Sequence, residues 1–560
     1  MEFLVLFLVF VIILMIKSAA EGRRRERELT QKLRDRFGTL SEEERTEEKY
    51  RSIQYYFRSR QEEPGALDDI TWNDLDMDRL YQALNQTNCA MGEEYLYDLL
   101  RRPLYDLAAL AERQRVIAFF EEHEEERVKL ALALAKIGKF PQISLYEYYH
   151  RAMELTSASV WPDLVQAALL LLALPVVSFA PPIGGTALVL LVAANVVTYF
   201  QRKKRIEPYL QVVAFLVRLT HQAETLRSLE LSDLAEYQER ILAGTAAFSS
   251  FRRGAWLINS GSSMSGDLAD IVMDYIRILF HVDLIKFASM VTAIRRHRRE
   301  LDIVYETIGF LDSCMAAASF RAYLPEWCIP ELTKSRGHRL SARQLYHPLL
   351  EEPVKNSIKT ERSVLITGSN ASGKSTFLKT VAINVVLAQT LATAACASYQ
   401  ASFFRIYSSM ALSDNLFGGE SYYMVEIKSL KRILDASATS SCPVFCCIDE
   451  VLRGTNTLER IAASSQILSV LAKKPVLAFV ATHDLELTQI LEAQYDNYHF
   501  SEEVRENDVR FDYRLKPGRA QSRNAIRLLS LLGFPEELTE AARWQAEQFL
   551  LTQEWKRLSE

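Results

Sequence analysis

The sequence predicts an α/β domain of the phosphate-loop type joined to an all-α region with transmembrane helices. A glycine-rich loop joins a short apolar strand at 364–366 to a helix at 377–391, which is the context that a phosphate loop needs. Two apolar runs, at 164–180 and 183–200, contain no charged residue. Elsewhere between residues 70 and 330 the apolar residues recur mostly with helical spacing.

The composition is that of a globular protein with several domains. The chain has 560 residues, of which 49% are hydrophobic and 24% charged, and this length exceeds a single ordinary core. The net charge of −5 excludes a globally basic nucleic-acid binder, but not one with a local basic face. The seven cysteines have neither paired spacing nor a zinc pattern, which indicates a reducing compartment.

Residues 1–20 are predicted to form an N-terminal transmembrane anchor. Residues 3–16 are almost wholly apolar, Glu2 precedes them, and Lys17 and the arginines at 23–25 follow. The positive-inside rule places that basic flank in the cytoplasm, and the acidic start argues against the alternative, a cleaved signal peptide. Residues 21–65 are rich in Arg and Glu, a composition typical of a solvated helix or a flexible charged stalk, and we favour a plain linker.

Residues 161–205 are predicted to form a transmembrane helical hairpin. Pro181-Pro182 and Gly184-Gly185 mark its turn, and the basic residues 202–205 mark its cytoplasmic exit. Each run is near the lower length limit for a membrane-crossing helix, so a buried core hairpin is the alternative. Asn195 is the one strongly polar residue of the second run, and we expect it to hydrogen bond across to the first helix.

The rest of the chain divides around this hairpin. Residues 66–160 and 206–340 are predicted to be the two parts of one helical core. Residues 341–520 form the predicted α/β domain, and residues 521–560 are predicted to be two helices around a turn.

The loop at 368–376 has the pattern of a phosphate-binding loop. Gly368 and Gly373 let the backbone turn tightly, so that successive N–H groups point at phosphate oxygens, and the helix N-terminus adds positive potential. We expect Lys374 to reach the β- and γ-phosphates and the Ser375 hydroxyl to bind Mg²⁺. The predicted ligands are therefore ATP and Mg²⁺.

Two later strands end in residues that suit this chemistry. The apolar run at 444–448 ends in Asp449 and Glu450; we expect Asp449 to hold Mg²⁺ and Glu450 to orient or deprotonate the attacking water. The run at 476–481 ends in Thr482 and His483. His483 is either a structural histidine or a sensor of the γ-phosphate, and its place after the loop and the acid pair favours the sensor.

Together these motifs resemble the MutS family of ABC-type ATPases. The resemblance covers about residues 70–550, with the hairpin as an interruption. Four segments carry it in order: GSNASGKST at 368–376, SDNL and GESYYMVE between 413 and 426, DEVLRGTNT at 449–457, and ATHDLELT at 481–488. The resemblance implies a homodimer in which Ser421 closes the partner's site, a dimerisation role for 521–560, and nucleotide contacts from Asn370 and Thr376.

The chain also departs from the family pattern. The resemblance starts near residue 66, so we expect neither the mismatch-reading domain nor the connector, and no obvious DNA-clamp domain interrupts the core. The family's R-H-P triplet is Tyr346-His347-Pro348 here. Val354 stands near Asn356 at the position that often stacks on adenine, which suggests weaker base stacking. ATP chemistry is expected to remain, whereas mismatch recognition is not.

Two functions follow from these expectations. The first is a multi-pass cell-membrane ATPase, with its ATPase domain in the cytoplasm, that moves its helical core as a dimer and acts on DNA in a repair- or recombination-like role. The second is an ATP-driven factor that remodels a membrane or an unknown protein partner without binding DNA. Any DNA binding is expected to be weak and blind to mismatches, because phosphate contacts carry no sequence information.

Overall fold

The computed structural model divides the chain into two compact units. The helical unit comprises residues 1–62, 84–99 and 115–323, and the nucleotide unit comprises residues 63–83, 100–114 and 324–560. The structure describes residues 2–41, 46–60, 65–140, 142–154, 160–229, 231–252, 268–334, 337–369, 372–410, 422–440, 442–505, 508–520, 526, 529–530, 533–552 and 554–557.

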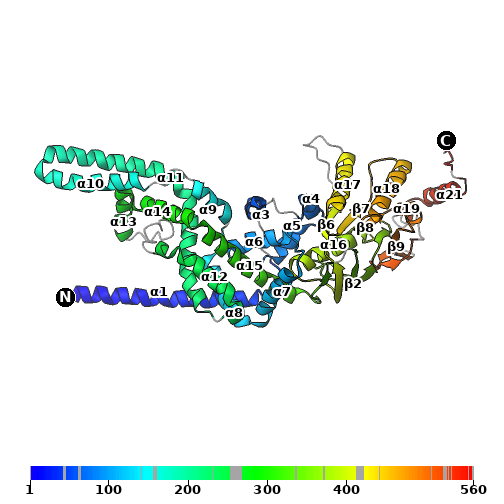
Figure 1. The fold of residues 1–560 in the computed structure, drawn as a ribbon, viewed down its shortest axis with the longest axis horizontal. Coiled ribbons are helices and arrows are strands. Elements are labelled where there is room, and N and C mark those ends of the chain that lie inside the picture. The colour runs from blue at the N-terminus through cyan, green and yellow to red at the C-terminus, as the bar shows by residue number, and fades with distance from the viewer. Residues whose placement is uncertain are drawn as a thin grey trace. The chain divides into compact units, whose positions relative to one another are not determined.

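The helical unit consists of helices in the part of the chain that the structure describes (Figure 1). Their bounds are α1 Glu2–Asp35, α2 Glu47–Ile53, α3 Tyr55–Ser59, α6 Ala90–Arg101, α8 Glu124–Ile137, α9 Leu145–Glu154, α10 Trp161–Phe179, α11 Pro181–Arg227, α12 Ala235–Ala246, α13 Leu268–Phe280, α14 Val282–Arg296 and α15 Arg298–Tyr323. Helix α7, Leu107–Glu122, has residues in both units.

The plain linker favoured between residues 21 and 65 is not what the structure has, because helices α1, α2 and α3 occupy most of the described residues there. Helix α1 continues to Asp35, and Lys136 of α8 forms an ion pair with Glu26 at 2.9 Å. In α2 and α3, Tyr56 and Phe57 are buried, and Lys49 forms a buried ion pair with Glu93 at 2.7 Å. Some of the charges that suggested a solvated segment therefore have partners elsewhere in the helical unit, whereas others, such as Arg24 with Glu28, form exposed pairs within it. The side chains of residues 2–16, within the predicted anchor, lie outside the described part, so the anchor stays a prediction.

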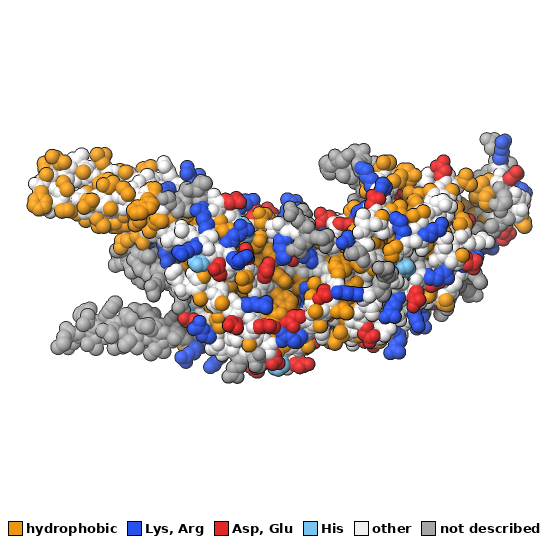
Figure 2. All heavy atoms as spheres, in the orientation of Figure 1, with side chains coloured by type: hydrophobic (Ala, Val, Ile, Leu, Met, Phe, Trp, Pro, Cys, Tyr) orange, Lys and Arg blue, Asp and Glu red, His pale blue; other side chains and the backbone are white. Residues whose placement is uncertain are grey.

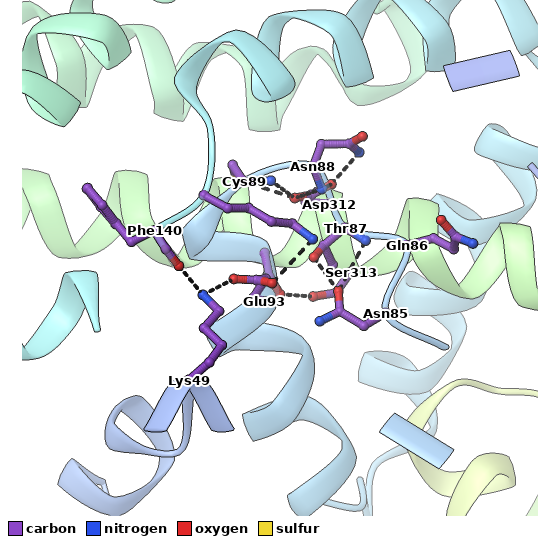
Figure 3. A network of polar contacts seen from close by, with 12 residues as sticks. Lys49, Asn85, Gln86, Thr87, Asn88, Cys89, Glu93, Phe140, Asp312 and Ser313 are labelled. Carbon is purple, nitrogen blue, oxygen red and sulfur yellow. Dashed lines mark hydrogen bonds and ion pairs between the residues drawn. The ribbon is translucent and has the colours of Figure 1, made fainter. Parts of the chain in front are cut away.

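A buried carboxylate fixes the start of α6 (Figure 3). Asp312 of α15 accepts hydrogen bonds from Asn88 N at 2.8 Å, Cys89 N at 3.0 Å and Asn88 Nδ2 at 2.7 Å. Burial raises the pKa of Asp312, and these donors oppose the rise. Gly92 must lack a side chain, because a Cβ there would lie 2.0 Å from Asp312 Oδ2. Asp312 thus satisfies N–H groups that a helix N-terminus leaves without intrahelical partners.

The apolar hairpin consists of α10 and the first half of α11. Its turn is at Ala180, and Pro181 and Pro182 begin α11, where their fixed φ suits a helix start. A Cβ at Gly184 would lie 2.5 Å from Val177 N, so this glycine allows the two helices to approach closely. Within the described residues, Trp161–Phe179 and Pro181–Glu207 are long and apolar enough to span a membrane, by length and composition alone.

Asn195 bonds to a different helix from the one expected. Its Nδ2 donates to Leu279 O of α13 at 2.8 Å, and its own carbonyl oxygen lies 2.9 Å from His281 Nε2. The contact across the hairpin comes from Thr198 instead, which donates to Gln166 Oε1 at 3.1 Å. The base of the hairpin therefore packs against α13 and α14, and Asn195 serves that contact.

The nucleotide unit is an α/β structure with two main sheets (Figure 1). One has the strand order β12-β9-β4-β8-β7-β6, with β12 antiparallel and the other strands parallel. The other has the order β1-β5-β2-β3. The strands are β1 Glu331–Thr333, β2 Leu340–Leu345, β3 Asn356–Thr360, β4 Ser363–Thr367, β5 Ser398–Ser402, β6 Arg405–Ser409, β7 Val444–Asp449, β8 Val476–Thr482, β9 Tyr495–His499 and β12 Lys516–Pro517, and β10 Glu502–Arg505 pairs with β11 Asp508–Phe511.

Helices flank these strands. They are α4 Asp69–Asp74, α5 Met77–Leu84, α16 Lys374–Thr390, α17 Tyr422–Thr439, α18 Thr457–Ala472, α19 Leu485–Ile490 and α21 Glu536–Thr552. Helix α4, expected in the helical core, groups with the nucleotide unit. The reason is that Asp74 accepts hydrogen bonds from Ser408 Oγ at 2.6 Å and Met410 N at 2.9 Å, at the end of β6.

The first prediction concerns the buried Glu94 of α6. Burial raises its pKa to about 8, against the hydrogen bonds from Ser144, Tyr305 and Leu145. Between about pH 4.5 and 8 the folded state therefore holds a proton that the unfolded state releases, so unfolding free energy falls as pH rises, by up to about 1.4 kcal/mol per pH unit. We expect Glu94→Gln to flatten this decline, as measured by Tm at pH 5, 6.5 and 8. The exposed Glu48→Gln is the control, and an unchanged slope in Glu94→Gln would contradict the assignment.

Candidate nucleotide-binding site

The loop after β4 has the backbone geometry of a phosphate cradle. Gly368 has φ +153° and Gly373 has φ +99°, conformations that favour glycine. A Cβ at Gly368 would lie 2.8 Å from Ser372 Oγ, and one at Gly373 would lie 3.1 Å from Tyr513 Cδ1. Helix α16 starts at Lys374, directly after Gly373, so its free N–H groups face the loop.

Lys374 extends back across this loop. Its Nζ donates to Gly368 O and Ser369 O, both at 2.8 Å, and lies 3.4 Å from His483 Nε2. Burial lowers the pKa of Lys374, and the carboxylates of Asp449 and Glu450 raise it. The ammonium group is thus held inside the turn where phosphate oxygens would lie.

Ser375 and Asp449 form a pair of oxygen ligands that fits Mg²⁺. Ser375 comes from the first turn of α16 and Asp449 from the end of β7, and Ser375 Oγ donates to Asp449 Oδ2 at 2.5 Å. A hydroxyl and a carboxylate are oxygen donors of the type that Mg²⁺ prefers, with phosphate oxygens and water completing its octahedron. The two residues fit the metal expected from the sequence.

Glu450 is held from two sides. Its Oε1 lies 3.0 Å from His483 Nε2, and its Oε2 lies 2.9 Å from Arg453 Nε. The hydrogen bond with His483 is the main cause that lowers the pKa of Glu450, so the side chain is a carboxylate at neutral pH. An ionised carboxylate fixed in this way can orient a water molecule and accept its proton.

A cavity of about 620 Å³ brings most of the predicted site residues together, a volume typical of sites for small molecules. Its lining includes Val354, Asn356, Gly373, Lys374, Ser375, Thr376, Asp449, Glu450 and His483. Gly368 contributes through its carbonyl oxygen, which accepts from Lys374. Asn370 and Ser421 lie outside the described residues.

Val354, Asn356 and Tyr513 line this cavity. Asn356 Nδ2 donates to Tyr513 O at 3.0 Å, and Asn356 Oδ1 accepts from Leu515 N at 2.8 Å, so this amide holds the 513–515 segment in place. Val354 and Tyr513 are both partly exposed and line the cavity. An aromatic face is therefore available to a nucleobase, in addition to the aliphatic side chain of Val354.

Sequence reasoning missed three residues of this region: Tyr513, Arg453 and Glu426. Tyr513 is far from the motifs in sequence and gives no local signal. Arg453 lies in the quoted motif at 449–457, but only the structure gives it contacts, to Glu450 and to Asp449 O at 2.6 Å. Glu426 is buried on α17, where its Oε1 accepts from Leu452 N at 2.6 Å.

Comparisons with known proteins agree with this geometry. Residues 364–550 match the family model of MutS domain V. The C-terminal region is a MutS domain V. Such a domain is an ATPase domain, and its match begins in β4 and includes the loop, the acid pair and His483.

The chain is also similar to curated proteins named as DNA mismatch repair proteins, three of which illustrate the extent of the likeness. The DNA mismatch repair protein MutS of Thermus thermophilus is 31% identical over 212 residues, which is 37% of this chain and 26% of the relative. That of Natronomonas pharaonis is 34% identical over 208 residues, 35% and 24% of the two chains. That of Aquifex pyrophilus is 33% identical over 264 residues, 44% and 30%. The chain spans between about a quarter and a third of the length of these relatives.

The second prediction tests the acid pair. Glu450→Gln should keep ATP binding but lower kcat by about 100-fold or more, because an amide cannot accept the proton of the attacking water. Steady-state ATPase rates and nucleotide affinity are the measurements. The contrasting variant is Lys374→Ala, which should lose affinity because phosphate charge is left uncompensated. Near-normal turnover in Glu450→Gln would remove Glu450 from the role of base.

Proposed function

We propose that this protein is a membrane-anchored ATPase that binds and hydrolyses Mg²⁺-ATP as a homodimer and so moves its helical unit. In the hydrolysis step, Lys374 and the N–H groups of the loop hold the β- and γ-phosphates. Ser375 and Asp449 hold the metal, and Glu450 orients the attacking water and accepts its proton. His483, between Glu450 and Lys374, senses the γ-phosphate. The 3.0 Å contact between His483 and Glu450 supports this arrangement.

The exposed apolar surface of the hairpin carries the membrane part of the proposal (Figure 2). Only 17% of the most apolar 18-residue stretch in each of α10 and α11 is buried, whereas a hairpin in a protein core would be mostly buried. The large apolar side chains of this hairpin with more than half their surface exposed are Trp161, Val165, Leu171, Leu172, Leu174, Phe179, Ile183, Val189, Leu190, Val197 and Phe200. A surface of this kind is typical of a contact with lipid or with another protein.

The basic end of the hairpin supports its orientation. Arg202, Lys203, Lys204 and Arg205 follow the apolar part of α11, and positive residues favour the cytoplasmic side. Arg202 pairs with the buried Asp163 at the start of α10, at 2.6 Å. Both ends of the hairpin then lie on the cytoplasmic side and the turn at Ala180 on the other. With residues 1–20 as a further anchor, each subunit crosses the membrane three times.

The third prediction tests this topology. A cysteine at Gly185, where nothing lies within 4 Å of an added Cβ, should react in intact cells with a membrane-impermeant maleimide. Gly184 is unsuitable, because a side chain there would strike α10. Lys431→Cys, on the exposed face of α17, should react only after permeabilisation. If Gly185→Cys behaved like Lys431→Cys, the hairpin would not cross the membrane.

The dimer in this proposal rests on the family resemblance. Domain V relatives bear the name of mismatch repair proteins, and the resemblance places Ser421 of one subunit at the ATP of the other. The names of these relatives also supply the second candidate function, an action on DNA. The similarity to these relatives covers only about a third of the chain, and one fold serves many functions. The exposed hairpin is therefore stronger support for a membrane role than the names of the relatives are for an action on DNA.

The fourth prediction separates the two functions. In nanodiscs, the lipid composition or a membrane partner should change the ATPase rate more than DNA does. The reason is that a ligand shifts a conformational equilibrium only if it binds the two states with different affinities, and in this proposal it is the membrane that contacts the moving part. Any DNA binding should weaken steeply with salt and not distinguish matched, mismatched and branched duplexes. The measurements are ATPase rate and DNA affinity at several salt concentrations. Tight, salt-resistant preference for a mismatch or a junction would restore a DNA-repair role.

A further inference from the structure

A buried carboxylate lies behind the acid pair, outside the cavity. Glu426 of α17 is 2% exposed. Its Oε1 accepts hydrogen bonds from Leu452 N at 2.6 Å and Arg453 N at 3.3 Å, while its Oε2 is buried without a hydrogen-bond partner in the described structure. Burying a carboxylate costs free energy, so a buried glutamate at this position indicates a structural or functional role.

The segment that Glu426 holds is under backbone strain. Glu450 has φ +64° and Leu452 has φ +59°, which are rare for residues other than glycine and persist only where surrounding contacts enforce them. Glu426 supplies two of those contacts. Gly454 supplies another, because its α-carbon packs so closely on α17 that a Cβ would lie 3.0 Å from Tyr423 Cβ. Helix α17 therefore enforces the conformation of the residues after β7.

The same segment aims the carboxylate of Glu450. Arg453, whose N–H bonds to Glu426, reaches back with Nε to Glu450 Oε2 at 2.9 Å and with NH2 to Asp449 O at 2.6 Å. The other oxygen of Glu450 contacts His483. A path of direct contacts thus runs from Glu426 through the backbone of Leu452 and Arg453 to the guanidinium group and then to Glu450.

We propose that Glu426 is a positioning residue for ATP hydrolysis, which sets Glu450 through the 452–453 backbone and so links α17 to the attacking water. This inference rests on the proposed function, because it takes Glu450 as the base.

The chemistry of Glu426 suggests which substitution should preserve its role. Burial raises the pKa of Glu426, while the two backbone N–H groups lower it. Both donors are neutral amides, so the carbonyl oxygen of a glutamine can accept them as well. Glu426→Gln should keep the segment in place, whereas Glu426→Ala leaves two buried N–H groups without an acceptor.

The fifth prediction compares these two variants in the full-length protein. Glu426→Ala should lower kcat by about 10- to 100-fold, since misplacing a general base forfeits part of its effect, with KM for ATP within about threefold of wild type. Glu426→Gln should keep kcat within about threefold. The matched control is Asp435→Ala on the same helix, whose exposed carboxylate pairs with Lys431; this variant should have no effect.

Three results would overturn the role of Glu426. The first is an unchanged kcat in Glu426→Ala. The second is a loss of ATP binding, which would assign Glu426 to folding of the cavity. The third is a further loss of kcat when Glu426→Ala is added to Glu450→Gln, because a residue acting through Glu450 has no further effect once the base is gone. A normal kcat in Glu450→Gln would instead overturn the proposed base. A strongly lowered kcat in Glu450→Gln, together with an unchanged kcat in Glu426→Ala, would overturn only the role of Glu426.

Discussion

The register of three parallel strands determines where the groups of the nucleotide site lie. Thr367 of β4 pairs with Thr482 of β8, and Asp449 of β7 pairs with Ala481 of β8. Because parallel strands end at one edge of the sheet and neighbours lie about 4.8 Å apart, the phosphate loop, the acid pair and His483 must emerge side by side. A shift of one residue in β7 would turn Asp449 to the other face of the sheet and separate it from Ser375.

That constraint also explains which parts of the site were predictable from sequence. The strands β4, β7 and β8 are fully buried except for Asp449 at the edge, so each appears in the sequence as an apolar run followed by polar residues. The residue types at those ends then indicate phosphate and metal chemistry. Glu426 and Tyr513 are different, because Glu426 ends a quoted motif that assigns it no role and Tyr513 lies outside the quoted motifs. Their roles come only from contacts with residues distant in sequence.

The errors in the helical unit have a related cause. The charge pattern between residues 21 and 65 predicts a solvated segment, but Lys49 forms a buried ion pair with Glu93, and such pairing is a tertiary property. The basic residues 202–205 are the predicted cytoplasmic exit of the hairpin, and α11 continues through them to Arg227. Its later part is amphipathic and buries Val212, Phe215 and Leu219. One continuous helix therefore contains both the apolar part of the hairpin and a part of the buried core. The sequence distinguishes the two parts only by their hydropathy.

This continuity has a mechanical consequence for the hairpin. Helix α11 has 47 residues, a length of about 70 Å at 1.5 Å per residue. It forms the second arm of the apolar hairpin and also a part of the buried helical core. Where the two parts meet, His281 lies between α13 and α14 with φ +53°. Its ring nitrogens lie 2.9 Å from Asp163 Oδ1 and 2.9 Å from Asn195 O, so it joins α10 to α11. A hairpin attached through an unbroken helix and buried polar contacts cannot pivot freely, because a pivot would break the contacts of His281 with Asp163 and Asn195 O and the hydrogen bond from Asn195 Nδ2 to Leu279 O, and a hydrogen bond lost in a buried setting is costly. Any displacement of the helical core along α11 must then reach the turn at Ala180.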